Sequence, residues 1–391
     1  MALRAAPEEK LVRVLSGATF FIFFQAYMVA PLIPRLASAF NTTEQMLGLA
    51  VPAYLLPYGL ATLFYGLLSD RIGRRRIMLV SLASFIVLTG LTATAQTTTQ
   101  LIVWRFLTGV GASGVVPLAL ALMGELFPYE RRGRPLGWLF GAMAGGMAFG
   151  STVGVMVEPF VGWRMLFLGV AVIGGVILLS LRPYLSLLDP AQPRPRLPLA
   201  EVMRGYRELL STARGVRTYA YVLLNGAFHS GVFTWLGLYF ARRYGLGEIG
   251  IGLALLGYGV PGFLLGPVIG RWADRFGRSW LVPLGAAVAA IAAAALIADV
   301  PVLAAGAAVT VMSLGYDMTQ PLLAGIVTDL GASRPGQAMG LNVFMLFTGF
   351  GLGSLLFGMA LPLGLSAALA VFSSVQFVLA LLAVPLFRCE S

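Results

Sequence analysis

The chain has 391 residues, of which 58% are hydrophobic and 11% charged, and it contains 48 glycines and 22 prolines. A soluble globular domain has roughly a quarter of its residues charged, so this composition excludes a soluble domain, and its hydrophobic content excludes a disordered chain. The net charge of +11 raises the question of a nucleic-acid partner, which the positions of the basic residues decide below.

Apolar runs follow one another between charged or Gly/Pro-rich breaks, and each is long enough to predict a transmembrane helix. The first six runs cover residues 13–38, 46–68, 77–97, 100–123, 135–157 and 163–183. The second six cover residues 217–240, 248–270, 279–298, 302–328, 337–360 and 364–387. The sequence therefore predicts an all-α polytopic membrane protein with 12 transmembrane helices. Residues 1–183 form an N-terminal bundle and residues 217–391 a C-terminal bundle.

The segment 184–216 between the two groups of spans is Pro-rich at first and then amphipathic, with several arginines. This pattern predicts a cytoplasmic linker that contains a surface helix lying along the anionic inner leaflet.

Basic residues gather in alternate connections between the predicted spans. If the N-terminus is cytoplasmic, 22 of the 27 basic residues fall in cytoplasmic segments, and only Arg35, Arg164, Arg242 and Arg243 fall outside. This distribution follows the positive-inside rule and accounts for the net charge, so we expect no nucleic-acid partner. It predicts a multi-pass protein of the cell (inner) membrane with both termini in the cytoplasm.

The two halves of the sequence carry an internal repeat. The residue pairs Tyr54/Tyr258 and Glu125/Asp329 are each 204 positions apart, and after the loss of one residue Gly146/Gly349 and Gly150/Gly353 are 203 apart. The loop after the second span recurs after the eighth with the same spacing of 204, including Gly66/Gly270 and Asp70/Asp274. With six spans in each copy, both copies point the same way across the membrane.

Residues 66–76, which read Gly-Leu-Leu-Ser-Asp-Arg-Ile-Gly-Arg-Arg-Arg, resemble the signature loop of the major facilitator superfamily between its second and third helices. The fourth span resembles the arginine-containing motif of that family at Trp104–Ala112. The fifth span resembles the glycine motif of 12-helix drug:proton antiporters and sugar-efflux-type bacterial exporters, although Ser151 replaces its proline and Val155 its last glycine. The resemblance implies the major facilitator fold, with two six-helix bundles related by a pseudo-twofold axis along the membrane normal.

The resemblance also implies a cytoplasmic gate at the signature loops, in which Asp70 faces the start of the eleventh helix and Arg74 clamps it. Carboxylate–guanidinium contacts of this kind latch two bundles in one state and release them in another. The alternative is that these charges only set the topology. The candidate gate residues are Gly66, Asp70, Arg71, Gly73, Arg74, Asp274, Arg275, Gly277 and Arg278.

Three ionisable residues, Arg105, His229 and Asp317, lie within apolar spans, where a charge is costly and faces a cavity or a partner. Gln25 lies 204 residues before His229, and the resemblance places all four residues on the helices that surround a central cavity. We expect Asp317 to carry the proton, because burial raises the pKa of a carboxyl group and a cationic partner lowers it again. Arg105 then tunes that carrier or binds an anion, and His229 titrates or contacts the substrate. For each of them, a purely structural role is the alternative.

Glycines of the fifth and eleventh spans form small-residue stripes that allow close helix packing or a hinge. Aromatic residues of the second, seventh and eighth spans are candidates to line an amphipathic pocket, or else they face lipid or a neighbouring helix. The glycines are Gly146, Gly150, Gly154, Gly349 and Gly353, and the aromatic residues are Tyr54, Tyr58, Tyr258 and Trp235.

The leading functional hypothesis is a proton-coupled secondary transporter that exports an amphipathic small molecule by alternating access. The first alternative is a sugar or organic-anion transporter, in uptake or efflux, with Arg105 and His229 binding the substrate. The second is a non-transporting membrane sensor or assembly protein. The sequence has no phosphate loop, nucleophile elbow or metal-ligand cluster, so we expect no enzyme activity, no metal and no cofactor besides the proton as coupling ion. The expected partners are the substrate and the lipid bilayer, and the expected state is a monomer.

Overall fold

The computed structural model describes residues 7–127, 133–188, 199–261, 278–331 and 334–390, together with Leu265, Ile269 and Trp272. The regular elements within these ranges are all helical. Among the described segments, nine are long and apolar enough to cross a membrane. The predicted all-α membrane protein is therefore confirmed at this level.

The helices before the linker cover most of residues 7–188. They are α1 (Pro7–Tyr27), α2 (Ile33–Ala39), α3 (Glu44–Gly48), α4 (Pro52–Ile72), α5 (Arg74–Ala93), α6 (Thr98–Ala112), α7 (Val115–Leu126), α8 (Gly133–Val161), α9 (Trp163–Ser180) and the 3-10 helix η2 (Arg182–Leu188).

The helices after residue 198 begin with α10 (Leu199–Leu209), which lies in the linker where the sequence predicts a surface helix. The others are α11 (Ala213–Tyr244), α12 (Glu248–Ala254), α14 (Arg278–Ala295), α15 (Val302–Asp317), α16 (Gln320–Leu330), α17 (Pro335–Ala360), η3 (Leu361–Leu363) and α18 (Leu365–Leu386). Part of the predicted span 248–270 lies outside the described residues.

At least five of the predicted spans are not continuous helices, which corrects the prediction of one unbroken helix for each; in the span 248–270, α12 ends at Ala254 and turns follow at residues 255–259. The runs 13–38, 46–68, 100–123 and 302–328 are each divided, into α1/α2, α3/α4, α6/α7 and α15/α16. Prolines cause the breaks, because proline lacks an N–H group and its ring clashes with the carbonyl four residues earlier. Pro117 and Pro321 follow the breaks of the fourth and tenth spans and are themselves 204 residues apart.

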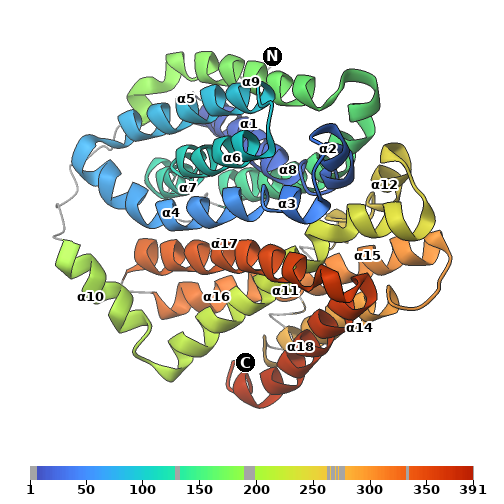
Figure 1. Ribbon diagram of the computed structural model, residues 1–391. Helices are drawn as coiled ribbons and strands as arrows, with labels where there is room; N and C mark the ends of the chain where they lie inside the picture. Colours follow the sequence, from blue (N-terminus) through green and yellow to red (C-terminus); the bar gives the residue numbers. More distant parts are fainter. Residues whose placement is uncertain are drawn as a thin grey trace, which may run out of the picture.

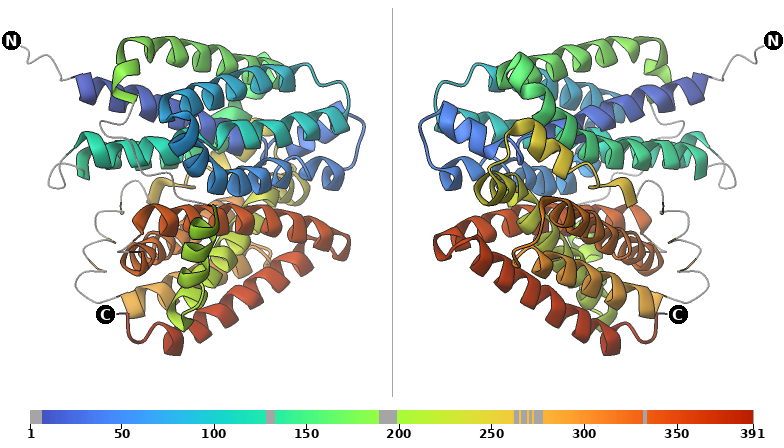
Figure 2. Two further views of the ribbon diagram at one scale, coloured as in Figure 1. Left: turned by 90° about the vertical axis from the view of Figure 1, so that its left-hand side faces the viewer. Right: turned by 90° about the vertical axis from the view of Figure 1, so that its right-hand side faces the viewer.

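The helices gather into two groups, with α1–α9 on one side of the molecule and most of α11–α18 on the other (Figures 1 and 2). Across the boundary α17 packs along α4, and α12 packs against α8. Helix α10 contacts the first part of α17, so the linker helix is docked on the second group.

Two helix crossings depend on glycine. In α8, a Cβ atom at Gly150 would overlap the backbone carbonyl oxygen of Phe24 in α1, and in α17 a Cβ at Gly353 would overlap that of Ala227 in α11. Gly146 and Gly349 approach Phe20 and Leu223 in the same way. The glycines and the residues they face are both separated by 203 positions, so the same crossing is made once in each half.

Candidate functional site

An aromatic cluster occupies the boundary between the two groups of helices. His229 of α11 lies at its centre, with its ring 3.8 Å from the ring of Tyr316 between centroids and its Nε2 2.6 Å from the hydroxyl of Tyr258. Phe233 stacks on Tyr258 with 4.1 Å between ring centroids and, at 5.8 Å, meets Tyr27 of α1. Rings from both groups of helices therefore converge on one place.

A second set of rings extends this cluster along α4. Tyr54 and Tyr58 stack on each other at 5.9 Å, and Tyr58 stacks on Phe347 of α17 at 4.4 Å. Phe350, one turn along α17, lies 6.1 Å from the ring of His229. The predicted pocket residues Tyr54, Tyr58 and Tyr258 thus lie in one connected aromatic cluster.

Trp235, the fourth predicted pocket aromatic, lies elsewhere. Its indole Nε1 donates a hydrogen bond to the carbonyl of Ser354 (3.1 Å), and its ring packs over the backbone at Gly48 and Gly358. Trp235 therefore packs where α11 meets α3 and α17, and it lies next to the aromatic cluster rather than in it.

Arg105 of α6 is fully buried and binds the ends of two broken helices. Its guanidinium donates to the carbonyls of Gln25 and Ala26 in the last turn of α1 (both 3.1 Å) and to that of Ala50, between α3 and α4 (3.1 Å). It also donates to the side-chain oxygen of Gln25 at 2.9 Å and lies over the ring of Tyr54 at 4.4 Å. Carbonyls at helix ends lack intrahelical donors, so Arg105 supplies the bonds that the breaks remove.

Several polar atoms beside the cluster have no hydrogen-bond partner within the described part of the chain. They are the hydroxyls of Tyr27 and Tyr54, Nε2 of Gln25 and Nδ1 of His229, and all four residues are buried. A buried polar group without a partner costs about 1–3 kcal/mol. Such groups are suited to receive hydrogen bonds from, or donate them to, a bound molecule.

Asp317 ends α15 directly after Tyr316, so it stands next to the ring that stacks on His229. Its Oδ2 lies 3.5 Å from the hydroxyl of Ser313, which in turn accepts from the backbone N–H of Gly259 (3.0 Å). The hydrogen bonds of Arg105 described above go to α1 and to the α3–α4 connection, and none of them goes to Asp317.

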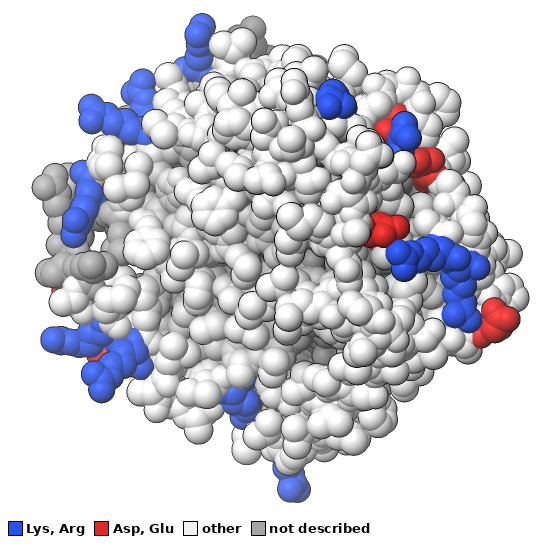
Figure 3. Space-filling model, viewed as in Figure 1, with Lys and Arg blue, Asp and Glu red and all other residues white. Residues whose placement is uncertain are grey.

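One end of the molecule carries ion pairs that join the two groups of helices. Arg35 of α2 lies 3.2 Å from Glu158 of α8 and 3.9 Å from Glu248 of α12, and Arg242 lies 3.1 Å from Glu44. The Glu158 side chain is 1% exposed. Figure 3 shows this rim, on the right near α12, as a mixture of acidic and basic side chains, separated from a mainly basic rim by a broad uncharged surface.

At the opposite end, the signature-loop residues lie at the junction of α4 and α5. Gly73 connects the two helices with φ 104°, a conformation that favours glycine, and Arg74 forms a two-bonded ion pair with Glu125 of α7 (both 2.7 Å). Gly66 and Arg71 lie in the last two turns of α4. The side chain of Asp70 and the residues Asp274, Arg275 and Gly277 lie outside the described residues, whereas Arg278 begins α14 beside Gly325.

The segment after α18 is clasped to this same end. Arg214 forms a two-bonded pair with Glu390 (2.8 and 2.7 Å) and also binds Asp329 (2.7 Å). Arg217 binds the same carboxylate and covers the ring of Phe387. The hydrogen bond from Arg214 lowers the pKa of Glu390 below its ordinary value of 4.5, and the same pair raises the pKa of Arg214.

This clasp is expected to weaken in acid. A carboxyl with a lowered pKa stabilises the folded state above its unfolded pKa of about 4.5, and this stabilisation is lost as the pH falls through the folded pKa. We expect Glu390→Gln to lower the thermal midpoint at pH 7, and we expect its difference from the wild type to shrink as the pH falls below 4.5 and through the lowered folded pKa of Glu390. Thermal unfolding of both proteins in detergent across this range is the measurement. A difference that stays constant with pH would contradict the ionic origin of the clasp.

Sequence reasoning misses several residues of these sites. Tyr27, Phe233 and Phe350 complete the aromatic cluster, and the repeat does not mark them, because the position matching Tyr27 is Gly231. Glu158 follows the predicted fifth span by one residue, so it does not count among the intramembrane charges. A search for acidic residues at the margins of the spans finds it.

Comparison with known proteins identifies relatives over most of the chain. The family model described as Major Facilitator Superfamily matches residues 15–266 and 244–391. An uncharacterized MFS-type transporter of Bacillus subtilis, YceJ, is 27% identical over 347 residues, which cover 87% of this chain and 86% of that protein. The multidrug resistance protein MdtL of Escherichia coli is 30% identical over 168 residues, 43% of this chain and 42% of MdtL.

Solved structures of similar fold extend over nearly the whole chain. The D-xylose–proton symporter superposes with a TM-score of 0.77 at 16% identity, covering 97% of both chains. The human organic anion transporter MFSD10 (TETRAN) gives a TM-score of 0.75 at 17% identity, covering 97% of this chain and 100% of that one. At these identities the likeness shows the fold alone.

Proposed function

This chain belongs to the major facilitator superfamily, and we propose that it is a proton-coupled secondary transporter that exports an amphipathic small molecule by alternating access. The observation that carries the proposal is the aromatic cluster between the two groups of helices. Beside it lie buried polar atoms that have no partner in the described part of the chain, and Asp317 lies at its edge. Rings and scattered hydrogen-bonding groups suit a molecule that is partly apolar and partly polar.

The proposal includes twelve spans in two six-helix bundles, residues 1–183 and 217–391, related by a parallel repeat and joined by the linker 184–216. The matched glycine crossings and the breaks before Pro117 and Pro321 support this repeat. The excess of arginine at the end bearing Arg74 supports a cytoplasmic location for that end and for both termini, in the cell membrane. We propose that the protein works as a monomer, without a cofactor.

In the proposed cycle the two ends act as opposing gates. The Arg242–Glu44 pair and the Arg35–Glu248 approach join the two groups at one end, so opening that end requires these contacts to separate. At the other end, the proposed gate comprises the signature-loop residues, with Arg74 held by Glu125. Export rather than uptake is supported by the partial glycine motif and by the relatives named as multidrug resistance proteins.

Binding of a sugar or organic anion by Arg105 is the less favoured alternative. The described donors of Arg105 already bind three carbonyls and the Gln25 side chain. An anion at this guanidinium would displace those bonds, whose acceptors have no other donor within the broken helices.

Loss of coupling in Asp317→Asn is the expected result that tests the proposal. Purified protein is placed in liposomes with a pH-sensitive dye inside, and lipophilic cations, sugars and organic anions are added in turn. We expect substrate-dependent proton movement in the wild type and its loss in Asp317→Asn, because the amide cannot release a proton. Asp299→Asn, which changes a fully exposed carboxyl near Arg243, is the control and keeps proton movement. Substrate movement without protons in the wild type would contradict proton coupling.

A further inference from the structure

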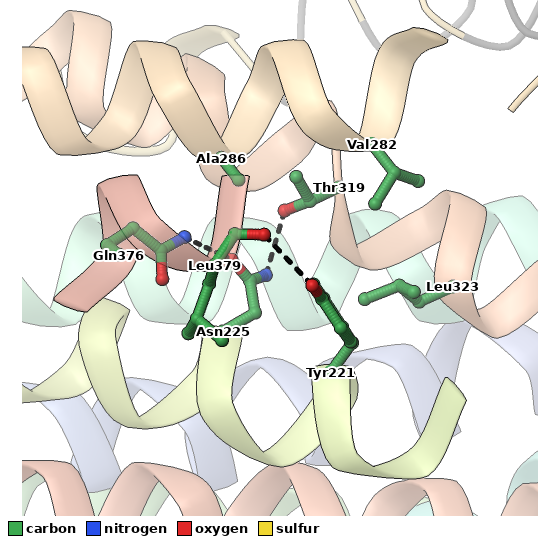
Figure 4. Close-up of a pocket in the computed structure, with 8 residues that line it drawn as sticks. All are labelled: Tyr221, Asn225, Val282, Ala286, Thr319, Leu323, Gln376 and Leu379. Carbon is green, nitrogen blue, oxygen red and sulfur yellow. Dashed lines mark hydrogen bonds between the residues drawn. The ribbon is translucent and has the colours of Figure 1, made fainter. Parts of the chain in front are cut away.

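A small cavity lies inside the second group of helices, apart from the aromatic cluster. It is lined by residues of α11, α14, α16 and α18 and of the α15–α16 connection, and four of these residues have polar side chains: Tyr221, Asn225, Thr319 and Gln376 (Figure 4). The space is of the order of a single water molecule. Polar side chains at such a position inside a membrane-embedded bundle call for an explanation, because apolar side chains would fill it without the free-energy cost of burying polar groups.

A chain of hydrogen bonds crosses this cavity and ends at the break of the tenth span. Gln376 Nε2 donates to Asn225 Oδ1 (3.1 Å), and Asn225 Nδ2 donates to the hydroxyl of Thr319 (2.8 Å), as the dashed lines of Figure 4 show. The Thr319 hydroxyl donates in turn to the carbonyl of Tyr316 (2.8 Å). Asn225 and Gln376 are 5% and 1% exposed, so water from outside does not compete for these bonds.

This chain of hydrogen bonds reaches the backbone at the break between α15 and α16. Pro321 has no N–H group, so the carbonyl of Asp317 loses its intrahelical donor and the helix stops there. Thr319 lies between α15 and α16, and both its N–H (3.0 Å) and its hydroxyl bond the Tyr316 carbonyl. The side-chain bonds from α11 and α18 therefore restrain the break from the side.

The repeat shows that these polar residues are not simply inherited from a common ancestor of the two halves. The positions 204 residues before Asn225 and Thr319 are Phe21 and Val115, and the position 203 before Gln376 is Ile173. The break of the fourth span is bonded differently, by Ser81 of α5, whose hydroxyl donates to the Gly111 carbonyl and accepts from the Gly114 N–H (3.1 Å). The polar chain is thus specific to the tenth span, whose last helical turn before the break carries Tyr316 and Asp317.

We propose that Asn225 and Gln376 are positioning residues that hold the break of the tenth span through Thr319, and so place Tyr316 against His229 and Asp317 beside the aromatic cluster. The hydrogen bonds described for these two side chains go to each other and to Thr319, not to a ring of the aromatic cluster. Their effect on transport rests on the proposed function, but their effect on the backbone at residues 316–319 does not.

The test compares Thr319→Val, which removes the hydroxyl at similar volume, with Thr319→Ser, which keeps it. Asn225→Leu removes the donor, and Thr310→Val is the control, because the Thr310 hydroxyl bonds within its own helix, to Gly306 in α15. Hydrogen exchange of peptides across residues 314–323 and substrate transport in liposomes are measured for each. Thr319→Val and Asn225→Leu are expected to lower exchange protection at the break about tenfold, the effect of one buried hydrogen bond.

Transport gives a second readout. We expect Vmax/KM of Thr319→Val to fall about tenfold through KM, whereas Thr319→Ser and Thr310→Val stay within about twofold. The Asn225→Leu/Thr319→Val double variant is expected to lose no more than the worse single variant, because both remove the same chain of bonds. Unchanged protection in Thr319→Val, or equal losses in Thr319→Ser, would overturn the proposal. If no substrate moves in the wild type, the proposed function fails, and exchange protection alone decides the positioning role.

Discussion

Replacing Arg105 with leucine is expected to destabilise the protein severely and to abolish transport. The substitution leaves the carbonyls of Gln25, Ala26 and Ala50 without their donor at two helix breaks. Each buried acceptor without a partner costs about 1–3 kcal/mol, and surrounding lipid supplies no replacement. We therefore expect a loss of several kcal/mol, seen as low yield of inserted protein and a large fall in thermal midpoint.

Arg105→Lys separates the charge of Arg105 from its shape. An ammonium group keeps the positive charge but lacks the planar fork that reaches three carbonyls at once, so we expect this variant to be intermediate in stability and nearly inactive. Arg164→Leu is the control, because it removes an exposed arginine that makes one hydrogen bond to a carbonyl, that of Ala95, and lies over the Trp163 ring. Wild-type stability in Arg105→Leu would show that the two helix breaks need no clamp.

A single methyl group at Gly150 is expected to have the second large effect. The Cβ of alanine would lie against the backbone of α1, 2.9 Å from the Cα of Phe24 and closer still to its carbonyl oxygen. Backbone cannot rotate away as a side chain does, so α8 must move off α1. Overpacking of this kind costs about 1–3 kcal/mol. We expect Gly150→Ala to lower the thermal midpoint and to reduce transport more than stability alone explains.

Gly141→Ala in the same helix is the matched control. Within the described residues, no atom beyond the adjoining backbone of α8 itself lies within 4 Å of a Cβ built at Gly141. This variant therefore gains the same helix propensity without the contact, and its midpoint should stay level or rise. Gly353→Ala is expected to repeat the Gly150 result in the other half, since its Cβ would lie 2.6 Å from the Cα of Ala227. A Gly150→Ala midpoint equal to that of Gly141→Ala would show that the crossing relaxes freely.

The sequence predicts much of the architecture because membrane helices are evident from composition and the duplication is evident from spacing. The pairs Gly150/Gly353 and Gly146/Gly349 share a spacing of 203 in the sequence, and they lie at equivalent helix crossings in the fold. The helix breaks escape prediction, although Pro117 and Pro321 share the spacing of the repeat. Apolar runs look continuous, because hydropathy averages over the prolines that interrupt them.

The sequence predicts which residues belong to the site better than it predicts the contacts that these residues make. Arg105, Gln25 and His229 stand out as polar groups in apolar spans, yet the partners of Arg105 are mostly backbone carbonyls, which no residue type reveals. Tyr27 does not stand out, because an aromatic residue in a membrane span usually faces lipid or a neighbouring helix. Glu390 does not stand out either, because its partners, Arg214 and Arg217, are about 175 residues away in the sequence.

The stacked rings around His229 bear on how selective this protein can be. An apolar wall separates two molecules that differ by one methylene by only about 10–200-fold, whereas a buried hydrogen-bond partner rejects a molecule lacking that group by about 10⁴-fold or more. Tyr54, Tyr58 and Phe347 stack on one another, and Nδ1 of His229 is one of the few buried polar atoms beside them that have no partner among the described residues. We therefore expect compounds of different shape to compete for the proposed site with affinities that differ gradually. The largest differences in affinity should come from their hydrogen-bonding groups rather than from their size.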